Sequence, residues 1–132
     1  MKTGRINILG QDHTLCFSTR VTTHIAEKYG SKNAMFDAMK SEDINTALQT
    51  SLWLLAEMLE AGRKYAKKAY GREEEPVSCD DLLDIYGFDD LGTLANQLSS
   101  AIIGSSESEV VAHAKNAEAT QGASGETRAL RG

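Results

Sequence analysis

A long run of apolar residues at helical spacing, residues 43–70, constrains this chain more than any other feature. These apolar and small residues recur at intervals of three and four, the period of one helix face. They are Ile44, Ala47, Leu48, Ser51, Leu52, Leu55, Met58, Leu59, Gly62, Tyr65, Ala66 and Ala69. A helix of this length would extend about 42 Å, more than the width of a small domain. Because Trp53 and Leu54 lie off this stripe, we expect contacts on two faces, with part of the helix projecting or meeting a second chain.

The N-terminus has the alternation of a β-hairpin. Ile6 and Ile8 alternate with polar neighbours, residues 10–12 have turn chemistry, and Leu15 and Phe17 alternate around Cys16. Two strands alone are not stable in water. We therefore expect a helical layer to cover the apolar face of the hairpin.

Start and stop signals predict shorter helices on both sides of the long one. Ser18 begins a helix that Gly30 ends, and Ser31 or Asn33 begins a short one. After Pro76, the pair Ser78 and Asp81 has the pattern of a capping box, and Gly87 ends that helix. Asp89 is then expected to cap a last helix that Gly104 closes. The sequence thus predicts a mainly α fold, with a small N-terminal hairpin packed on a bundle of about five helices.

The last part of the chain is poor in large apolar residues. Ile, Leu, Val and Phe occur 24 times in residues 1–104 but only three times in residues 105–132. So few apolar groups cannot offset a chain entropy of about 1 to 2 kcal/mol per residue. We expect one domain over residues 1–104 and a disordered tail over residues 105–132.

Charge and cysteine content exclude several classes of function. With 19 acidic and 14 basic residues, the formal net charge is -5, which disfavours nucleic acid and anionic membranes as partners. The longest apolar run is residues 52–56, too short to cross a membrane. Cys16 and Cys79 have no metal-type spacing and suggest no disulfide framework, so a reducing cytosol fits best.

An acidic segment follows the long helix. Residues 73–90 contain eight Asp or Glu and no Lys or Arg. They lack the DxDxDG pattern of a calcium loop, and several fall at helix starts, where they cap amides. The alternatives are that the segment recognises a basic partner or folds back on the basic end of the long helix. That end is formed by Arg63, Lys64, Lys67, Lys68 and Arg72.

Reactive side chains form no catalytic pattern. His24 and Glu27 could share a metal, but no second pair completes the site, so we interpret them as solvent-facing. His13 and Cys16 are expected on opposite faces of a strand. Cys79 at a helix start could have a lowered pKa, although a structural or incidental role is favoured. No phosphate loop, GxSxG or HExxH motif occurs. The interpretation is a non-enzyme without metal or cofactor.

Residues 22–40 superficially resemble a helix-turn-helix with Gly30 at the turn. A recognition helix would expose Arg, Asn, Gln or Lys at its start, whereas Met35, Phe36 and Met39 dominate here. Two packed helices are the favoured interpretation. A small DNA-binding regulator is kept as the alternative function.

The order of segments resembles the tail assembly chaperones of long-tailed bacteriophages and prophages of Gram-positive hosts. The resemblance extends over about residues 5–120 and is one of pattern rather than of a catalytic signature. It is carried by Leu15-Cys-Phe-Ser18, Ala26-Glu-Lys-Tyr-Gly-Ser31, Leu52-Trp-Leu-Leu-Ala-Glu-Met-Leu-Glu-Ala-Gly62, Leu82-Leu-Asp-Ile-Tyr-Gly87, Ala101-Ile-Ile-Gly104 and Lys115-Asn-Ala-Glu-Ala-Thr120.

This resemblance implies a small helical protein of the host cytoplasm. Members of the family coat the apolar tape measure protein until tail tube subunits replace them, and they are absent from the finished particle. Many also exist in a longer, frameshifted form that recruits the tail tube protein. This chain would correspond to the short form, and we expect it to form a homo-oligomer. A structural head–tail connector or tail terminator component is a further alternative.

A chaperone that holds an extended helix reversibly needs an apolar strip, for which methionine is well suited. Our candidate partner-binding residues are Met35, Met39, Trp53 and Met58. The alternative is that these side chains fill the core. Trp53 is the strongest candidate because it lies off the main stripe and aromatic anchors dominate interfaces.

Overall fold

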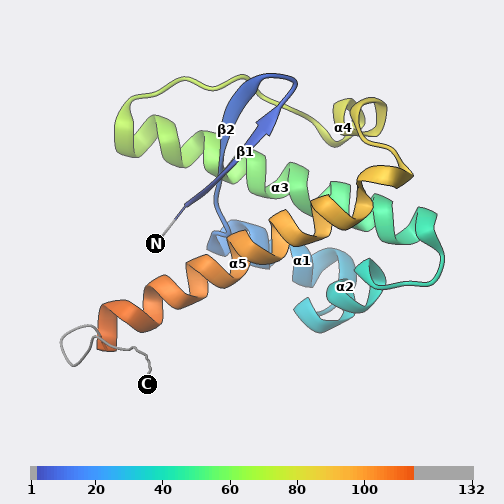
Figure 1. Cartoon of the computed structure of the whole chain (residues 1–132). Helices are drawn as coiled ribbons and strands as arrows, with labels where there is room; N and C mark the ends of the chain where they lie inside the picture. The colour runs from blue at the N-terminus through green and yellow to red at the C-terminus, as the bar shows by residue number, and fades with distance from the viewer. Residues whose placement is uncertain (1–2, 115–132) are drawn as a thin grey trace.

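The computed structural model describes residues 3–114, and the side chains of residues 3–103. Within this part of the chain the fold is mainly α with an N-terminal hairpin, as predicted (Figure 1). The elements in order are β1 (Gly4–Ile8), β2 (Gln11–Leu15), α1 (Thr19–Tyr29), α2 (Lys32–Met39), α3 (Ile44–Tyr70), α4 (Cys79–Ile85), the 3-10 helix η1 (Phe88–Asp90) and α5 (Leu91–Ala114).

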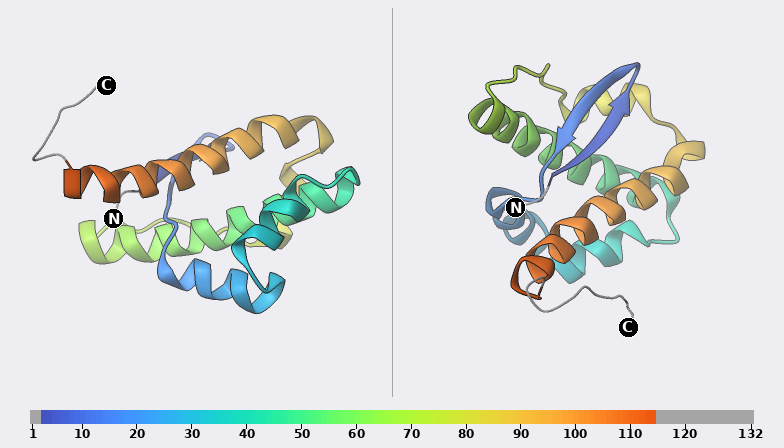
Figure 2. Two further views of the ribbon diagram at one scale, coloured as in Figure 1. Left: turned by 90° about the horizontal axis from the view of Figure 1, so that it is seen from below. Right: turned by 60° about the vertical axis from the view of Figure 1, so that its left-hand side comes forward.

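The long helix α3 is the centre of the molecule. It lies between α5 on one side and α1 and α2 on the other, while the hairpin crosses it and α4 packs near its N-terminal half (Figures 1 and 2). Leu54, which lies off the main apolar stripe, is fully buried, as is Leu55 on the stripe. The expected contacts on two faces of α3 are therefore confirmed, and they are made by other elements of the same chain. Contact with a second chain stays a prediction.

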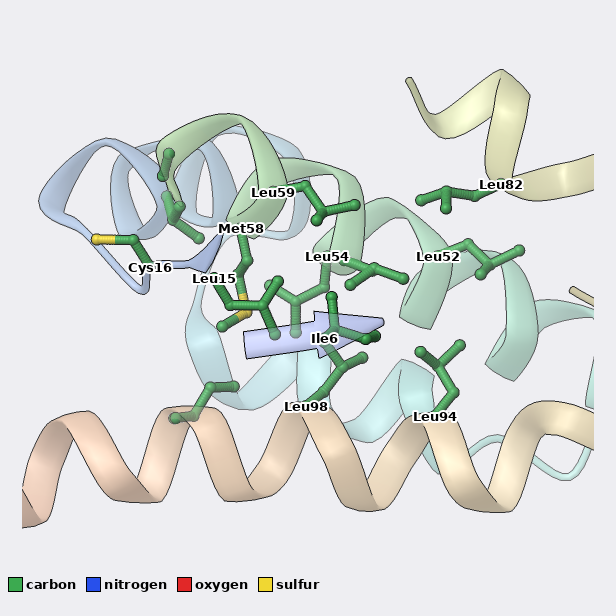
Figure 3. Close-up of a cluster of buried hydrophobic side chains, with 14 of the residues drawn as sticks. Ile6, Leu15, Cys16, Leu52, Leu54, Met58, Leu59, Leu82, Leu94 and Leu98 are labelled. Carbon is green, nitrogen blue, oxygen red and sulfur yellow. The ribbon is translucent and has the colours of Figure 1, made fainter. Parts of the chain in front are cut away.

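The core is formed where the hairpin and the five α-helices meet. Figure 3 shows Ile6 and Leu15 of the hairpin among side chains of α3, with Leu94 and Leu98 approaching from α5. Burying an aliphatic side chain of this kind contributes about 1.5 to 3 kcal/mol. The helical layer that the hairpin was expected to require is thus supplied mainly by α3 and α5.

Most helix boundaries agree with the capping signals in the sequence. Ser31 accepts a hydrogen bond from the amide of Ala34, Asp43 accepts one from Asn45, and Ser78 with Asp81 forms the predicted capping box. Two boundaries differ from prediction. Asp89 lies within η1 rather than capping α5, and α5 continues past Gly104 to Ala114.

The predicted helix end at Gly104 is wrong because glycine inside a helix costs only about 1 kcal/mol relative to alanine. No proline follows to force a stop, since the single proline of the chain is Pro76. The rest of the predicted disordered tail, residues 115–132, lies outside the described residues.

The turn of the hairpin lies at Leu9 and Gly10, not at residues 10–12. Ile8 pairs with Gln11, so the loop has two residues, and both have positive φ, 50° at Leu9 and 88° at Gly10. Positive φ at both loop residues is characteristic of a type I′ turn, whose backbone twist matches the twist of the two strands. Asp12 belongs to β2, where its carboxylate accepts a hydrogen bond from the Asn7 side chain at 3.0 Å.

Leu9→Asn is expected to stabilise the domain by about 1 kcal/mol, because a branched side chain at positive φ is strained and Asn-Gly is the favoured type I′ pair. Leu9 is 81% exposed, so little packing is lost. Thermal unfolding followed by circular dichroism measures the effect. A lower melting temperature in the variant would contradict this account of the turn.

The segment after α3 folds back over the hairpin. The Glu74 carboxylate accepts hydrogen bonds from the backbone amide of Thr14 at 3.0 Å and from the Thr14 hydroxyl at 2.6 Å. Arg72 lies 3.4 Å from the same carboxylate, and Glu73 lies 3.3 Å from Lys67 near the end of α3. The first part of the acidic segment therefore does fold back on the basic end of the long helix, one of the two alternatives left open above.

Candidate functional site: a groove between α3 and α4

Two adjoining hollows lie along the N-terminal half of α3, with volumes of about 310 and 300 Å³. They share Asn45 and Gln49 of α3 and Leu83 of α4, and we call them together the α3–α4 groove. The hollow on the α1 side is also lined by Lys28, Tyr29, Thr46, Thr50, Trp53 and Cys79. The other is also lined by Leu48, Leu52, Tyr86, Gly87 and Phe88.

Large apolar side chains are exposed along this groove. Leu83 is 49% exposed and Phe88 is 62% exposed. Ile44, which precedes the lining residue Asn45, is 52% exposed. Exposed apolar groups gathered beside a hollow are typical of an interaction surface rather than of a plain solvated face.

Trp53 is held at one end of the groove by aromatic contacts. Its ring meets Tyr29 edge to face, with 5.3 Å between centroids and 74° between planes. The Lys28 ammonium lies 5.7 Å from the centroid of each ring. These contacts fix the orientation of a partly buried indole, which makes it a pre-ordered anchor for a partner.

Of the four predicted partner-binding residues, only Trp53 lines the groove. Met35 and Met58 are 0% exposed, so neither side chain can contact a partner on the surface of this conformation. Both belong to the apolar faces that α2 and α3 turn toward the core (Figure 3 shows Met58). Met39 is partly buried against the same core. For Met35 and Met58, the core-filling alternative is the one that the structure shows.

Leu83 and Phe88 were not among the predicted site residues. Leu82 and Leu83 are neighbours on a helix, and consecutive helical residues point about 100° apart. Leu82 is fully buried, so Leu83 has to point elsewhere. The pair of leucines was the signal in the sequence that one of them lies outside the core.

Carboxylates flank the α4 side of the groove. Asp80 lies one turn before Leu83, and Asp89 follows Phe88; both are exposed. Within residues 3–103, neither forms an ion pair with a basic side chain. Asp81 and Asp90, by contrast, accept hydrogen bonds from the amides of Ser78 and Gly87.

Cys79, which also lines the groove, is not an activated thiol. Burial, followed by the negative charge of Asp80, raises the pKa of the Cys79 thiol above its ordinary value. The alternative of a lowered pKa at this helix start is therefore wrong, because partial burial and a neighbouring carboxylate both disfavour the thiolate.

Neither of the two histidines among residues 3–103, His13 and His24, belongs to a metal site. His24 Nδ1 is hydrogen-bonded to Glu57 Oε1 of α3, rather than sharing a ligand position with Glu27. His13 and Cys16 are both buried. Among the described residues, no group of three or more His, Cys, Asp or Glu side chains is placed to hold a metal ion.

The same part of the chain has no helix of sufficient length and apolar character to cross a membrane.

Comparisons with known proteins add no relative of this chain. No protein-family model, curated protein or solved structure matches it. The function of this chain therefore has to be inferred from the groove and from the resemblance in segment order.

Proposed function

We propose that this chain is a phage tail assembly chaperone that binds a helical segment of the tape measure protein in the α3–α4 groove. The observation that carries the proposal is the exposure of Leu83 and Phe88 beside the ordered ring of Trp53. An amphipathic helix laid in such a groove buries its apolar side chains at intervals of three and four. The resemblance to tail assembly chaperones supplies the identity of the helical partner.

The composition of the groove suits temporary binding. Covering exposed apolar surface contributes about 25 cal/mol per Å², and a groove with only a few anchors gives moderate affinity once the cost of association is subtracted. Tail tube subunits could then displace the chaperone. In this proposal the chain acts in the host cytoplasm as a homo-oligomer, and a longer form recruits the tail tube protein.

Co-expression of the full chain with the tape measure protein of the same phage tests the proposal. We expect the two proteins to co-purify and the tape measure protein to become more soluble. The double variant Leu83→Ser/Phe88→Ser should lower recovery of the complex at least about tenfold, because apolar anchors supply most of the binding energy. Both side chains are exposed, so the variant should stay folded.

Ile103→Ser is a matched control, because Ile103 is also an exposed apolar residue, 55% exposed, but belongs to α5. It should leave recovery unchanged. Absence of co-purification with the unmodified chain, together with no gain in solubility, would contradict the proposal. Detection of the chain in purified phage particles would favour a structural tail component instead.

A further inference from the structure

We infer that the segment bound in the α3–α4 groove is an amphipathic helix with Lys or Arg along one flank, which faces α4 and η1. This inference rests on the proposed function insofar as it takes the groove as the binding site. It adds the chemistry of the partner, which the resemblance does not supply.

The first observation is the charge of the α4 side. Residues 78–90 contain Asp80, Asp81, Asp84, Asp89 and Asp90 and no Lys or Arg. We call Asp80 and Asp89 the acidic rim, because they flank Leu83 and Phe88. Neither rim carboxylate has an ion-pair partner among residues 3–103, whereas Glu60, Glu73 and Glu74 are each paired with a basic side chain.

The second observation is the charge on the opposite side of the groove. Among the described residues that line the two hollows, Lys28 of α1 alone carries a charged side chain. Its ammonium lies over Tyr29 and Trp53. The lining itself thus has a cation on the α1 side, whereas the charged groups next to the lining on the α4 side are carboxylates. A bound helix with cations on both flanks would meet Lys28 unfavourably. A helix with a single basic flank is complementary to both sides.

The apolar floor between these two sides determines the spacing of the apolar side chains in the partner. Leu48 and Leu52 lie one turn apart on α3 and are buried beneath the hollow, so the accessible apolar surface is that of Leu83 on α4 and Phe88 on η1. Such a floor accepts apolar side chains at intervals of three and four. The partner is therefore a helix with an apolar stripe bordered by Lys or Arg on the side next to the acidic rim.

Two synthetic helical peptides with the same apolar stripe test this chemistry. One carries Lys along one flank, and the other carries Glu at the same positions. Trp53 is the only tryptophan of the chain, so its fluorescence in the full-length protein reports directly on occupancy of the groove. We expect the Lys peptide to bind at least about tenfold more tightly in about 50 mM salt. The difference should shrink severalfold in about 500 mM salt, because screening weakens exposed charge pairs.

Substitutions in the acidic rim should change the preference of the protein for the Lys peptide over the Glu peptide. Asp80→Lys/Asp89→Lys should favour the Glu peptide, while the milder Asp80→Asn/Asp89→Asn should abolish most of the discrimination. The control Asp37→Lys/Glu75→Lys makes the same change in net charge at exposed positions outside the rim and should keep the preference for the Lys peptide. Circular dichroism establishes that each variant is folded.

The outcomes separate this inference from the proposed function. Equal binding of the two peptides, no change of Trp53 fluorescence with either, or unchanged discrimination in both rim variants would overturn the inference. If the tape measure protein still co-purifies in that case, the proposed function stands. If the Lys peptide binds with rim-dependent preference but the tape measure protein does not co-purify, the inference stands and the proposed function fails.

Discussion

Gly62→Ala is expected to destabilise the domain by at least about 3 kcal/mol, because added volume in a packed core forces backbone or side chains to move. A Cβ atom at position 62 would lie 1.8 Å from the carbonyl oxygen of Thr14 and 2.4 Å from its carbonyl carbon. Both are backbone atoms of β2, which no side-chain rotation can displace. For a domain of this size, such a loss lowers the melting temperature by about 12 °C or more.

A backbone hydrogen bond holds β2 close to α3 near Gly62. The amide of Cys16 donates a hydrogen bond to the carbonyl oxygen of Met58 at 3.1 Å, which joins the end of β2 to α3 one turn before Gly62. Separating the two elements to admit a methyl group would strain this bond and loosen the packing of Leu15 (Figure 3). We therefore expect loss of cooperative unfolding as well as a lower midpoint in urea.

Gly92→Ala is the matched control. Gly92 also lies in a helix, at the start of α5, but a Cβ atom there would meet nothing within 4 Å. Alanine is preferred over glycine in a helix by up to about 1 kcal/mol, so this variant should be unchanged or slightly more stable. A Gly62→Ala protein that melts within about 2 °C of the unmodified chain would show that the crossing is not as tight as the structure indicates.

Local patterns in the sequence predicted most of the fold. The three-and-four spacing located α3, and serine caps located the starts of α2 and α4. These signals are short in range, so one sequence suffices to find them. The need for glycine at position 62 arises because α3 crosses β2, and these two elements are distant in sequence. The periodicity of the sequence could only classify Gly62 as a small residue of the apolar stripe.

The candidate site was less predictable than the fold. Trp53 was identified because it lies off the main stripe, and it does line the groove. Met35 and Met58 were chosen for their chemistry, but any apolar residue on a stripe is more often in the core than on a surface. Phe88 lies in a 3-10 helix with no periodic pattern, so only the packing of α4 and η1 beside α3 reveals its exposure.

Glu74→Gln is expected to lower the free energy of unfolding at neutral pH by about 1 to 3 kcal/mol, the contribution of hydrogen bonds to a charged group. The Glu74 side chain is 6% exposed and holds the segment after α3 against Thr14 of β2. Burial of the carboxyl group raises its pKa, but hydrogen bonds from Thr14 and the charge of Arg72 outweigh burial. The pKa of Glu74 therefore lies below its ordinary value.

The lowered pKa of Glu74 determines how this contribution varies with pH. Because the folded state holds the carboxylate more strongly than the unfolded state does, the contribution is fully present above the pKa of an unfolded glutamate. It is lost as the pH falls through the lower pKa of the folded state. The difference in unfolding free energy between the unmodified chain and Glu74→Gln should thus be largest near pH 7 and should shrink as the pH falls below about 4.

Urea denaturation of both proteins between about pH 7 and pH 3 measures this difference. Glu75→Gln is the control, since it removes the same charge from the adjacent, exposed residue and should change stability by less than about 0.5 kcal/mol. A Glu74→Gln effect that stays constant over the whole range would mean that the carboxylate charge contributes nothing to holding this segment. Equal effects of the two variants would attribute the change to net charge rather than to the contacts with Thr14 and Arg72.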